Sequence, residues 1–388
     1  MKPFPRALLL LALVLAAINL RPGITSLAPL IERIALELSL SRGFISLTTA
    51  LPVLCMGLLA PFAPRFAVRL GLERTIALCM ALIVLALALR MVGHASAILI
   101  GSAVLLGMAI AVAGPLLSGF IKRHFAGRMG SVVGWYSLSM AIGGAGGAVL
   151  TAPATQWLFD DWSYGLAIWA VPALLALLLW LSLPNHPETD GASSGSGLPW
   201  RKPRAWLISA FFAIQAGLFY ALATWAVARY QEAGLSVMHS NSLFSVSMLM
   251  GLPSSFLLPW LAQRFQNRYV LLMGCGLLST LSLAMITFAP TLWPEVWAVT
   301  IGFGLGGSFA LSLVLPLYEA GSPMAVSRWT AMMLCTGYSL ACVTPVLTGL
   351  ARDAAGSYLL PFSVLTGLAL LMTLLAWLLR RGPLKHGA

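Results

Sequence analysis

One basic residue, Arg21, is predicted to lie inside an apolar segment of the chain. It comes 14 positions after Ala7, where the apolar run begins. That distance is about 21 Å along a helix, well within the roughly 30 Å of lipid hydrocarbon. An unpaired guanidinium at such a depth is costly, so Arg21 is expected to face protein, a water-filled cavity or an anion. Its planar fork of N–H donors suits a small delocalised anion or a nitro group.

The residues that follow Arg21 predict a break in its helix. Pro22 has no backbone N–H to donate, and Gly23 follows at once, so we expect freed backbone groups that can line a cavity. The alternative is that the Arg21 side chain extends to the outer membrane interface, or pairs with Glu32 or Glu37.

A second group of residues could complete a binding site, because a small polar solute needs a few placed donors on an otherwise apolar wall. The group consists of Asn19, Tyr136, Gln215, Tyr220, Trp225 and Tyr338. Each residue also has a structural interpretation, since Asn and Gln can join helices by hydrogen bonds and Tyr and Trp can anchor at the interface. Gln215 and Tyr220 are five positions apart, so they do not share one face of a regular helix.

Other reactive residues form no recognisable catalytic or metal-binding pattern. The five cysteines lie in apolar stretches without a CxxC pair, and the five histidines lie at or near loops and the C-terminus without an HExxH motif. A membrane-embedded enzyme would need such groups around one cavity, so we expect no enzyme, metal or cofactor. The glycine-rich runs 143–147 and 302–307 are interpreted as helix-packing surfaces, not as nucleotide loops.

Composition indicates that the elements holding these residues lie in a lipid bilayer. Hydrophobic residues make up 60% of the 388 positions, and charged residues make up 9%. An ordinary soluble domain has about 25% charged residues, so a soluble fold is excluded. The net charge of +12 does not indicate a nucleic-acid partner, because the basic residues fall in short loops between apolar spans.

Twelve apolar spans follow one another, each near the roughly 20 residues that cross a bilayer. They run approximately over 7–30, 43–63, 75–93, 97–121, 130–153, 164–184, 205–229, 240–262, 269–289, 293–318, 327–350 and 358–379. The first span follows Lys2 and Arg6 as in a signal peptide, but further spans come immediately, so we expect a retained signal-anchor helix. The predicted fold is an all-α membrane protein.

The distribution of basic residues predicts the orientation. With both termini in the cytoplasm, 17 Lys and Arg residues fall on the cytoplasmic side. The five on the opposite side are Arg33, Arg42, Arg90, Arg229 and Arg352. This excess is the one expected for cytoplasmic loops, so the charge of +12 reflects topology.

A segment rich in Pro, Gly, Ser and charge, 185–204, predicts a cytoplasmic linker near the midpoint. It separates two predicted six-helix domains, 1–184 and 205–388. Residues 134–138 resemble 337–340, and residues 64–66 resemble 263–265, at matching places in the two halves. These likenesses favour a duplicated six-helix unit.

The sequence resembles the major facilitator superfamily. Over nearly its whole length it is similar to the cyanate permease and 2-nitroimidazole transporter family. The resemblance is carried by Asn19-Leu20-Arg21-Pro22, residues 121–125, Tyr136-Ser137-Leu138, Gln215, Tyr220, Trp225, Gly337-Tyr338, Pro345, Gly349 and Asp353. It implies a polytopic inner-membrane secondary transporter that moves a small anion or a small electron-poor solute.

The sequence departs from the superfamily pattern in the loop after the second span. An Asp usual in that loop is absent from the stretch that contains Arg69, Glu73 and Arg74, which we take as candidate gating residues with Glu73 as the substitute carboxylate. Leu334 stands where relatives tend to have Gln. The fifth span also lacks the Gly-Pro pair of proton antiporters, which weakens an interpretation as a drug/proton exchanger.

Glu319 is the carboxylate expected nearest to the membrane interior, and we predict no other acid within the spans. Proton coupling requires a buried titratable group, so Glu319 is the candidate for coupling. Its alternative role is to pair with Arg328 at the loop edge, in which case transport is facilitated diffusion, exchange or coupling through the charge of the substrate.

These observations together predict a monomeric bacterial inner-membrane transporter that works by alternating access. Its expected partners are the lipid bilayer and a small-molecule substrate, either a cyanate-like anion or a solute such as a nitroimidazole. Efflux of drugs or other xenobiotics is the alternative function, and a membrane-embedded enzyme is a distant one. The sequence leaves the direction of transport open.

Overall fold

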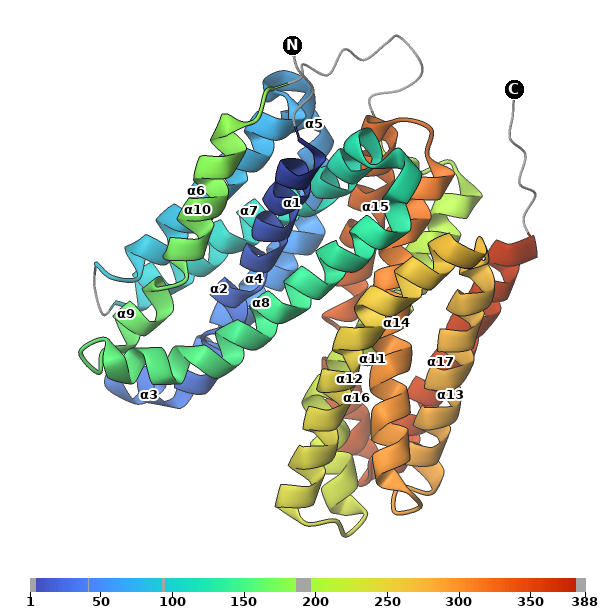
Figure 1. Ribbon diagram of the computed structural model, residues 1–388. Helices are drawn as coiled ribbons and strands as arrows, with labels where there is room; N and C mark the ends of the chain where they lie inside the picture. The colour runs from blue at the N-terminus through green and yellow to red at the C-terminus, as the bar shows by residue number, and fades with distance from the viewer. Residues whose placement is uncertain (1–4, 41, 93–94, 186–196, 382–388) are drawn as a thin grey trace. The chain divides into compact units, whose positions relative to one another are not determined.

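The computed structural model describes residues 5–40, 42–92, 95–185 and 197–381. Every regular element within these ranges is helical (Figure 1). Twelve helical stretches of this described part are long and apolar enough to cross a membrane. The predicted all-α fold and its number of spans are therefore confirmed.

The described residues of the first half form ten α-helices, and three of the spans there each comprise two of these helices. They are α1 (Arg6–Asn19), α2 (Pro22–Thr25), α3 (Ile31–Glu37), α4 (Arg42–Leu59), α5 (Ala63–Leu70), α6 (Leu72–Leu89), α7 (Ser96–His124), α8 (Met129–Trp157), α9 (Trp162–Ala167) and α10 (Ala170–Ser182). The predicted sixth span is divided between α9 and α10, and the second is divided between α4 and α5.

The described residues of the second half form seven α-helices. They are α11 (Pro203–Glu232), α12 (Val237–Phe265), α13 (Arg268–Phe288), α14 (Pro294–Glu319), α15 (Pro323–Ala341), α16 (Thr344–Ala355) and α17 (Leu359–Arg381). The predicted eleventh span is divided between α15 and α16. Of the predicted linker, residues 186–196 lie outside the described residues, as do the chain ends 1–4 and 382–388.

The chain forms two compact units. Unit 1 comprises Met1–Gly127, Trp135–Leu198 and Glu319–Cys335, and unit 2 comprises Arg128–Gly134, Pro199–Tyr318 and Thr336–Ala388. In unit 1, α7 packs against α4 and α6, and α6 also packs against α10. In unit 2, α17 packs against α13 and α11, and α11 also packs against α12 and α16.

Glycines allow α12 and α14 of unit 2 to touch at their backbones. A Cβ atom on Gly302 would overlap the carbonyl oxygen of Ser247, and one on Gly306 would lie 2.6 Å from the Cα atom of Gly251. Any larger residue at these two positions of α14 would push the helices apart. The interpretation of the 302–307 run as a packing surface is confirmed.

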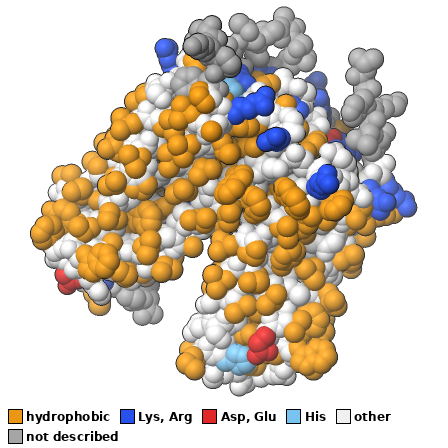
Figure 2. Space-filling view, in the orientation of Figure 1, with side chains coloured by type: hydrophobic (Ala, Val, Ile, Leu, Met, Phe, Trp, Pro, Cys, Tyr) orange, Lys and Arg blue, Asp and Glu red, His pale blue; other side chains and the backbone are white. Residues whose placement is uncertain are grey.

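The surface along the helices is apolar. In Figure 2, hydrophobic side chains cover the face in view over the length of the helices, and Lys and Arg side chains gather near the helix ends. Many leucines and valines of the membrane-spanning helices are exposed, among them Leu181 and Val364. Lipid tolerates such a surface, whereas water does not, so the chain is a multi-pass membrane protein.

The segment that follows the first span is held in place at the end of unit 1. Leu27, Leu30 and Ile34 pack in a buried cluster with Trp162 of α9. At the exposed edge, the Arg33 guanidinium donates to a carboxylate oxygen of Asp160 at 2.8 Å. This hydrogen bond raises the pKa of Arg33 above its usual value.

Candidate functional site

The first span is interrupted at Arg21, as the sequence predicts. Helix α1 ends at Asn19, and α2 begins at Pro22 with Arg21 as its N-cap residue. The Arg21 carbonyl accepts hydrogen bonds from the backbone N–H groups of Ile24 and Thr25, at 3.0 and 3.1 Å. The half-buried Arg21 therefore occupies the junction of two helical segments within one apolar span.

Glycines of α8 lie directly against this break. A Cβ atom on Gly143 would overlap the carbonyl oxygen of Ile18, and one on Gly147 would lie 2.9 Å from the Cα atom of Pro22. A Cβ atom on Gly144 would lie in ordinary contact with that of Arg21, at 3.4 Å. The glycine-rich run of the fifth span thus packs on the segment that holds Arg21.

A buried arginine that the sequence analysis did not select also supports the break. Arg90 follows α6 and is only 1% exposed. Its Nη1 group donates to the Gly23 carbonyl at 3.0 Å, and its Nε group donates to the Ser102 hydroxyl at 3.0 Å. The backbone N–H of Leu27 donates to the Ile24 carbonyl at 3.4 Å and not to the Gly23 carbonyl. The Arg90 guanidinium therefore supplies a hydrogen bond to the Gly23 carbonyl.

A second arginine binds helices together in unit 2. Arg229, near the end of α11, is 7% exposed and donates to the Thr287 carbonyl at the end of α13, at 2.7 Å. It also pairs with Glu232 at 3.2 Å. Arg90 and Arg229 were both expected as loop charges on the outer side, because each stands at the end of an apolar span. The structure corrects that expectation of exposure, since both guanidinium groups are buried.

Two buried amide side chains join helices. Asn19 donates from Nδ2 to the Pro172 carbonyl of α10 at 3.1 Å. Gln215 of α11 donates from Nε2 to the Leu305 carbonyl of α14 at 3.1 Å. Both side chains are 2% exposed, and neither Asn19 Oδ1 nor Gln215 Oε1 accepts a hydrogen bond from a described residue. Each amide therefore bridges helices and keeps one buried acceptor oxygen.

The aromatic members of the predicted site occupy different environments. Trp225 donates from Nε1 to the Pro345 carbonyl of α16 at 2.8 Å, and its ring lies where a Cβ atom on Gly349 would meet it at 2.8 Å. Tyr338 is buried with its ring edge-on to Phe212, at a centroid distance of 5.4 Å. These contacts join α16 and α15 to α11.

The two remaining tyrosines differ in burial. Tyr136 is buried in α8, and the half-buried Tyr220 ring lies edge-on to Phe219 at 5.5 Å. The predicted site residues are distributed over both units. Unit 1 contains Arg21, Asn19 and Tyr136, and unit 2 contains Gln215, Tyr220, Trp225 and Tyr338. Arg21 and Asn19 lie together at the end of α1, and Gln215, Tyr220 and Trp225 lie on α11.

One predicted gating residue lies in a buried ion pair. Glu73, in the first turn of α6, is 2% exposed, and its carboxylate lies 3.1 Å from Arg123 Nη1 and 3.5 Å from His124 Nε2 at the end of α7. The expectation that no acid other than Glu319 lies within the spans is therefore wrong. The sequence analysis began the third span at residue 75, whereas α6 begins at Leu72 and includes Glu73.

The other three predicted gating or coupling residues are more accessible. Arg69 is exposed in the last turn of α5. Arg74 is exposed, and its backbone N–H donates to Asn185 Oδ1 at 3.4 Å. Glu319 is half-buried as the last residue of α14.

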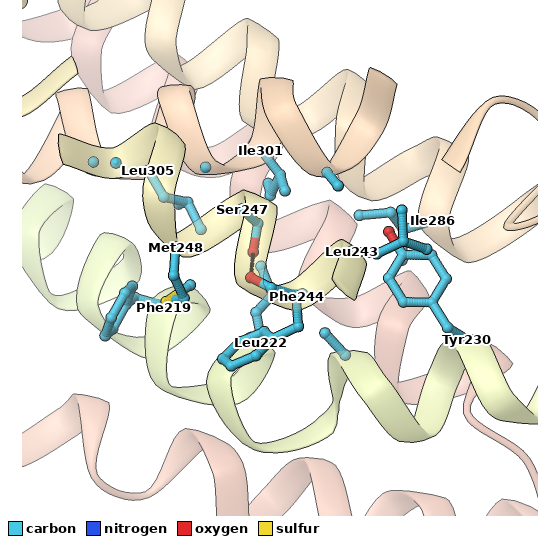
Figure 3. Close-up of a pocket in the computed structure, with 15 residues that line it drawn as sticks. Phe219, Leu222, Tyr230, Leu243, Phe244, Ser247, Met248, Ile286, Ile301 and Leu305 are labelled. Carbon is cyan, nitrogen blue, oxygen red and sulfur yellow. Dashed lines mark hydrogen bonds between the residues drawn. The ribbon is translucent and has the colours of Figure 1, made fainter. Parts of the chain in front are cut away.

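Unit 2 contains an apolar crevice between α11, α12 and α14 (Figure 3). Its empty volume of about 520 Å³ includes space that is open to the surroundings. Its large apolar and aromatic lining residues include Phe219, Phe244, Met248, Tyr230, Ile301 and Leu305. No lining residue is charged, and the hydroxyl of the lining Ser247 donates to the Phe244 carbonyl at 2.7 Å. The crevice was missed because a single sequence does not show which faces of three helices meet.

The sequence matches proteins of known family. A model of the Major Facilitator Superfamily matches residues 9–342. The cyanate transport protein CynX of Escherichia coli (strain K12) is 32% identical over 361 residues, which cover 92% of each chain. The 2-nitroimidazole transporter of the same organism is 29% identical over 375 residues, 96% of this chain and 94% of the relative. The uncharacterized transporter YycB of Bacillus subtilis (strain 168) is 30% identical over 375 residues, 94% of this chain and 91% of the relative.

Solved structures share the fold at lower identity. The fucose:proton symporter FucP of E. coli superposes with a TM-score of 0.77 at 14% identity, over 97% of this chain and 99% of that one. The proton:xylose symporter XylE superposes with a TM-score of 0.78 at 12% identity, over 96% and 95% of the two chains. At these identities the likeness concerns the fold alone.

Proposed function

Because the chain belongs to the Major Facilitator Superfamily, we propose that it is a secondary transporter that moves a small solute across the bacterial inner membrane by alternating access. The proposed substrate is a cyanate-like anion or a small electron-poor solute such as a nitroimidazole. The relatives named for cyanate and for 2-nitroimidazole match this chain over nine-tenths of its length, which supports both substrate classes.

The observation that carries the proposal is the position of Arg21 at a helix break inside an apolar span. A guanidinium in this position can offer two parallel N–H donors to the oxygens of a nitro group, or charge to a small anion. The Gly23 carbonyl, just after the break, accepts a hydrogen bond from Arg90, and the backbone on either side of Arg21 is packed against glycines of α8. The segment that carries Arg21 is therefore fixed by packing and by a hydrogen bond, and a binding site needs such a rigid support.

Transport by the purified protein in proteoliposomes tests the proposal. We expect uptake or exchange of labelled cyanate or labelled 2-nitroimidazole above that of protein-free vesicles, and loss of this transport in Arg21→Ala. The same assay with and without an imposed pH gradient measures coupling. Absence of transport of both solutes by correctly oriented protein would refute the proposal, and full transport by Arg21→Ala would remove Arg21 from the site.

A further inference from the structure

Basic side chains gather at one end of unit 2, where α11 and α13 begin and α17 ends. The set, which we call the basic end, consists of Arg201, Lys202, Arg204, Arg268, Arg380 and Arg381. Helix α17 packs against both α11 and α13 (Figure 1). The six residues therefore share one end of the unit, although they come from three parts of the chain.

Two of these arginines hold the helix ends together. Arg204 donates from Nη2 to the Tyr269 hydroxyl of α13 at 2.7 Å and to the Leu379 carbonyl of α17 at 3.1 Å. The Arg268 guanidinium lies over the rings of Tyr269 and Tyr318, at 4.8 and 4.4 Å from their centroids. Both arginines are half-buried, so they fix the three helices to one another and add positive charge below the surface.

The outer part of the basic end is a hollow lined by Trp377, Arg380 and Arg381, in the last turns of α17. Both arginines are exposed, and the Arg381 guanidinium carbon lies 3.6 Å from the centre of the Trp377 ring. The ring holds the guanidinium in place by cation–π attraction and leaves its charge in full. Two adjacent guanidinium groups in an open hollow favour an anion with several oxygen atoms, such as a phosphate.

Unit 2 places its carboxylates away from this hollow. It contains three acidic residues, and all three lie at the opposite end of its helices: Glu232, Glu295 and Asp353. Glu319, which ends α14, belongs to unit 1. A phosphate in the hollow therefore meets positive charge of unit 2 without a carboxylate of that unit to repel it.

The surface that leads along α17 to the hollow is apolar. Leu374, Leu378 and Arg381 follow one another at the four- and three-residue spacing of one helix face, and the two leucines are 50% and 43% exposed. The exposed Trp200 and Trp206, at the start of α11, indicate the level of the lipid headgroups, where tryptophan is enriched. An ion from the water would contact the arginines alone, whereas a phospholipid would contact the arginines and the leucines.

We propose that the basic end binds an anionic phospholipid, with its phosphate on Arg380 and Arg381 and one acyl chain along Leu378 and Leu374. A headgroup of the phosphatidylglycerol kind suits the hollow, because it has a negative phosphodiester and no cationic group. Phosphatidylcholine carries an ammonium group that the two arginines repel. None of these residues belongs to the candidate solute site, so the proposal goes beyond the proposed function and does not depend on it.

Native mass spectrometry of the purified full chain in detergent micelles tests the proposal, because it resolves each bound lipid. The probes are phosphatidylglycerol and phosphatidylcholine with identical acyl chains. Two basic residues near the headgroups correspond to roughly thirtyfold in affinity, so we expect the wild type to prefer phosphatidylglycerol by about tenfold or more. In Arg380→Gln/Arg381→Gln this preference is expected to fall to about threefold or less.

The matched control removes two other exposed arginines, in Arg65→Gln/Arg128→Gln. It has the same net charge as the test variant and is expected to keep the preference of the wild type. All four arginines are exposed, so both variants are expected to fold. As a second measurement, phosphatidylglycerol is expected to raise the melting temperature of the wild type and the control above that in phosphatidylcholine, and to leave that of the test variant unchanged.

A competitor separates a phospholipid from a soluble phosphate. Glycerophosphoglycerol is the headgroup of phosphatidylglycerol without acyl chains, so it lacks the part that packs on Leu374 and Leu378. We expect no displacement of phosphatidylglycerol when it is added in large excess. Displacement would overturn the assignment to a lipid and would indicate a site for soluble phosphodiesters.

Three further results would overturn the proposal. Equal binding of the two lipids by the wild type would show that the basic end selects no anionic headgroup. An unchanged preference in Arg380→Gln/Arg381→Gln would place the selective contact elsewhere. An equal loss in the control variant would show that the total charge of the chain, and not this hollow, attracts the lipid.

Discussion

The guanidinium of Arg21 can recognise a ligand through its charge or through the geometry of its donors, and the two contributions can be separated by substitution. Lys keeps the positive charge but replaces the planar fork by a single ammonium group. The surrounding packing favours geometry, since Gly143 and Gly147 of α8 leave no room for a side chain against Ile18 and Pro22, on either side of Arg21.

We therefore predict that Arg21→Lys loses most of the transport activity, by about tenfold or more, as expected when a bidentate contact is lost. Initial uptake rates in proteoliposomes, corrected for the amount of inserted protein, give the measurement. Arg65→Lys is the control, because Arg65 is an exposed residue of α5 outside the candidate site. Substantial activity of Arg21→Lys would reduce the role of Arg21 to electrostatic attraction.

Two carboxylates are candidates for proton transfer in energy coupling. Glu319 ends α14 and is half-buried, whereas Glu73 is buried against Arg123. This ion pair joins the first turn of α6 to the end of α7. Glu73 is therefore a structural partner of α7, and Glu319 keeps its place as the candidate for proton transfer.

For Glu319→Gln we predict an unchanged ratio of pH-driven uptake to exchange at equal concentrations, together with some loss of expression or stability. The reason is that a helix-end carboxylate that only pairs locally does not carry protons across the cycle. An anion that crosses alone responds instead to the membrane potential, by about 2.3 kcal/mol per 100 mV. Anion transport that ignores a valinomycin-set voltage, requires an inward proton gradient and is abolished in Glu319→Gln would contradict the uncoupled mechanism.

At the scale of helices, close packing of α12 on α14 depends on single glycines. Gly302→Ala is predicted to lower the melting temperature, because its methyl group would overlap the carbonyl oxygen of Ser247, and overpacking of this kind costs about 1–3 kcal/mol. Gly274→Ala in α13 is the matched control, since nothing lies within 4 Å of a Cβ atom there. It is expected to be neutral or stabilising by up to about 1 kcal/mol. Equal melting temperatures for the two variants in detergent would contradict the packing argument.

The helices were predictable from sequence because lipid imposes both their length and their apolar character. The break at Arg21 was predictable too, since Pro22 cannot donate the hydrogen bond that a continuous helix needs. The burial of Arg90 was not. A count of basic residues treats every arginine at the end of a span as a loop charge, and only the fold shows that this guanidinium meets the Gly23 carbonyl.

The candidate site was predictable only in part, because contacts between helices depend on the fold and not on residue type. Residue type identified Asn19 and Gln215 as polar groups within apolar spans, but the neighbouring carbonyl that each amide binds depends on which helices pack together. The crevice beside Gln215 could not be predicted from residue type at all. Most of its lining residues are ordinary apolar residues, and only the packing of their helices brings them around one space.

For the whole molecule, the prediction concerns orientation in the membrane. The excess of Lys and Arg in one set of loops predicts that both termini and the 185–204 loop lie in the cytoplasm. Alkaline phosphatase, which is active only in the periplasm, is predicted to be inactive when fused after Ser196 or Ala388. Fused after Gly234, between α11 and α12, it is predicted to be active, because this loop falls on the opposite side.

The three fusions test the orientation and the number of spans together. If all three activities were reversed, either the whole chain would be inverted, against the preference that positive residues show for the cytoplasm, or an odd number of spans would precede the linker. If only the fusion after Ala388 were active, one span of the second half would fail to cross. Activity after Ser196 with inactivity after Gly234 and Ala388 would place an odd number of crossings before the linker and an even number after Gly234, and the division into two halves of six spans would be wrong.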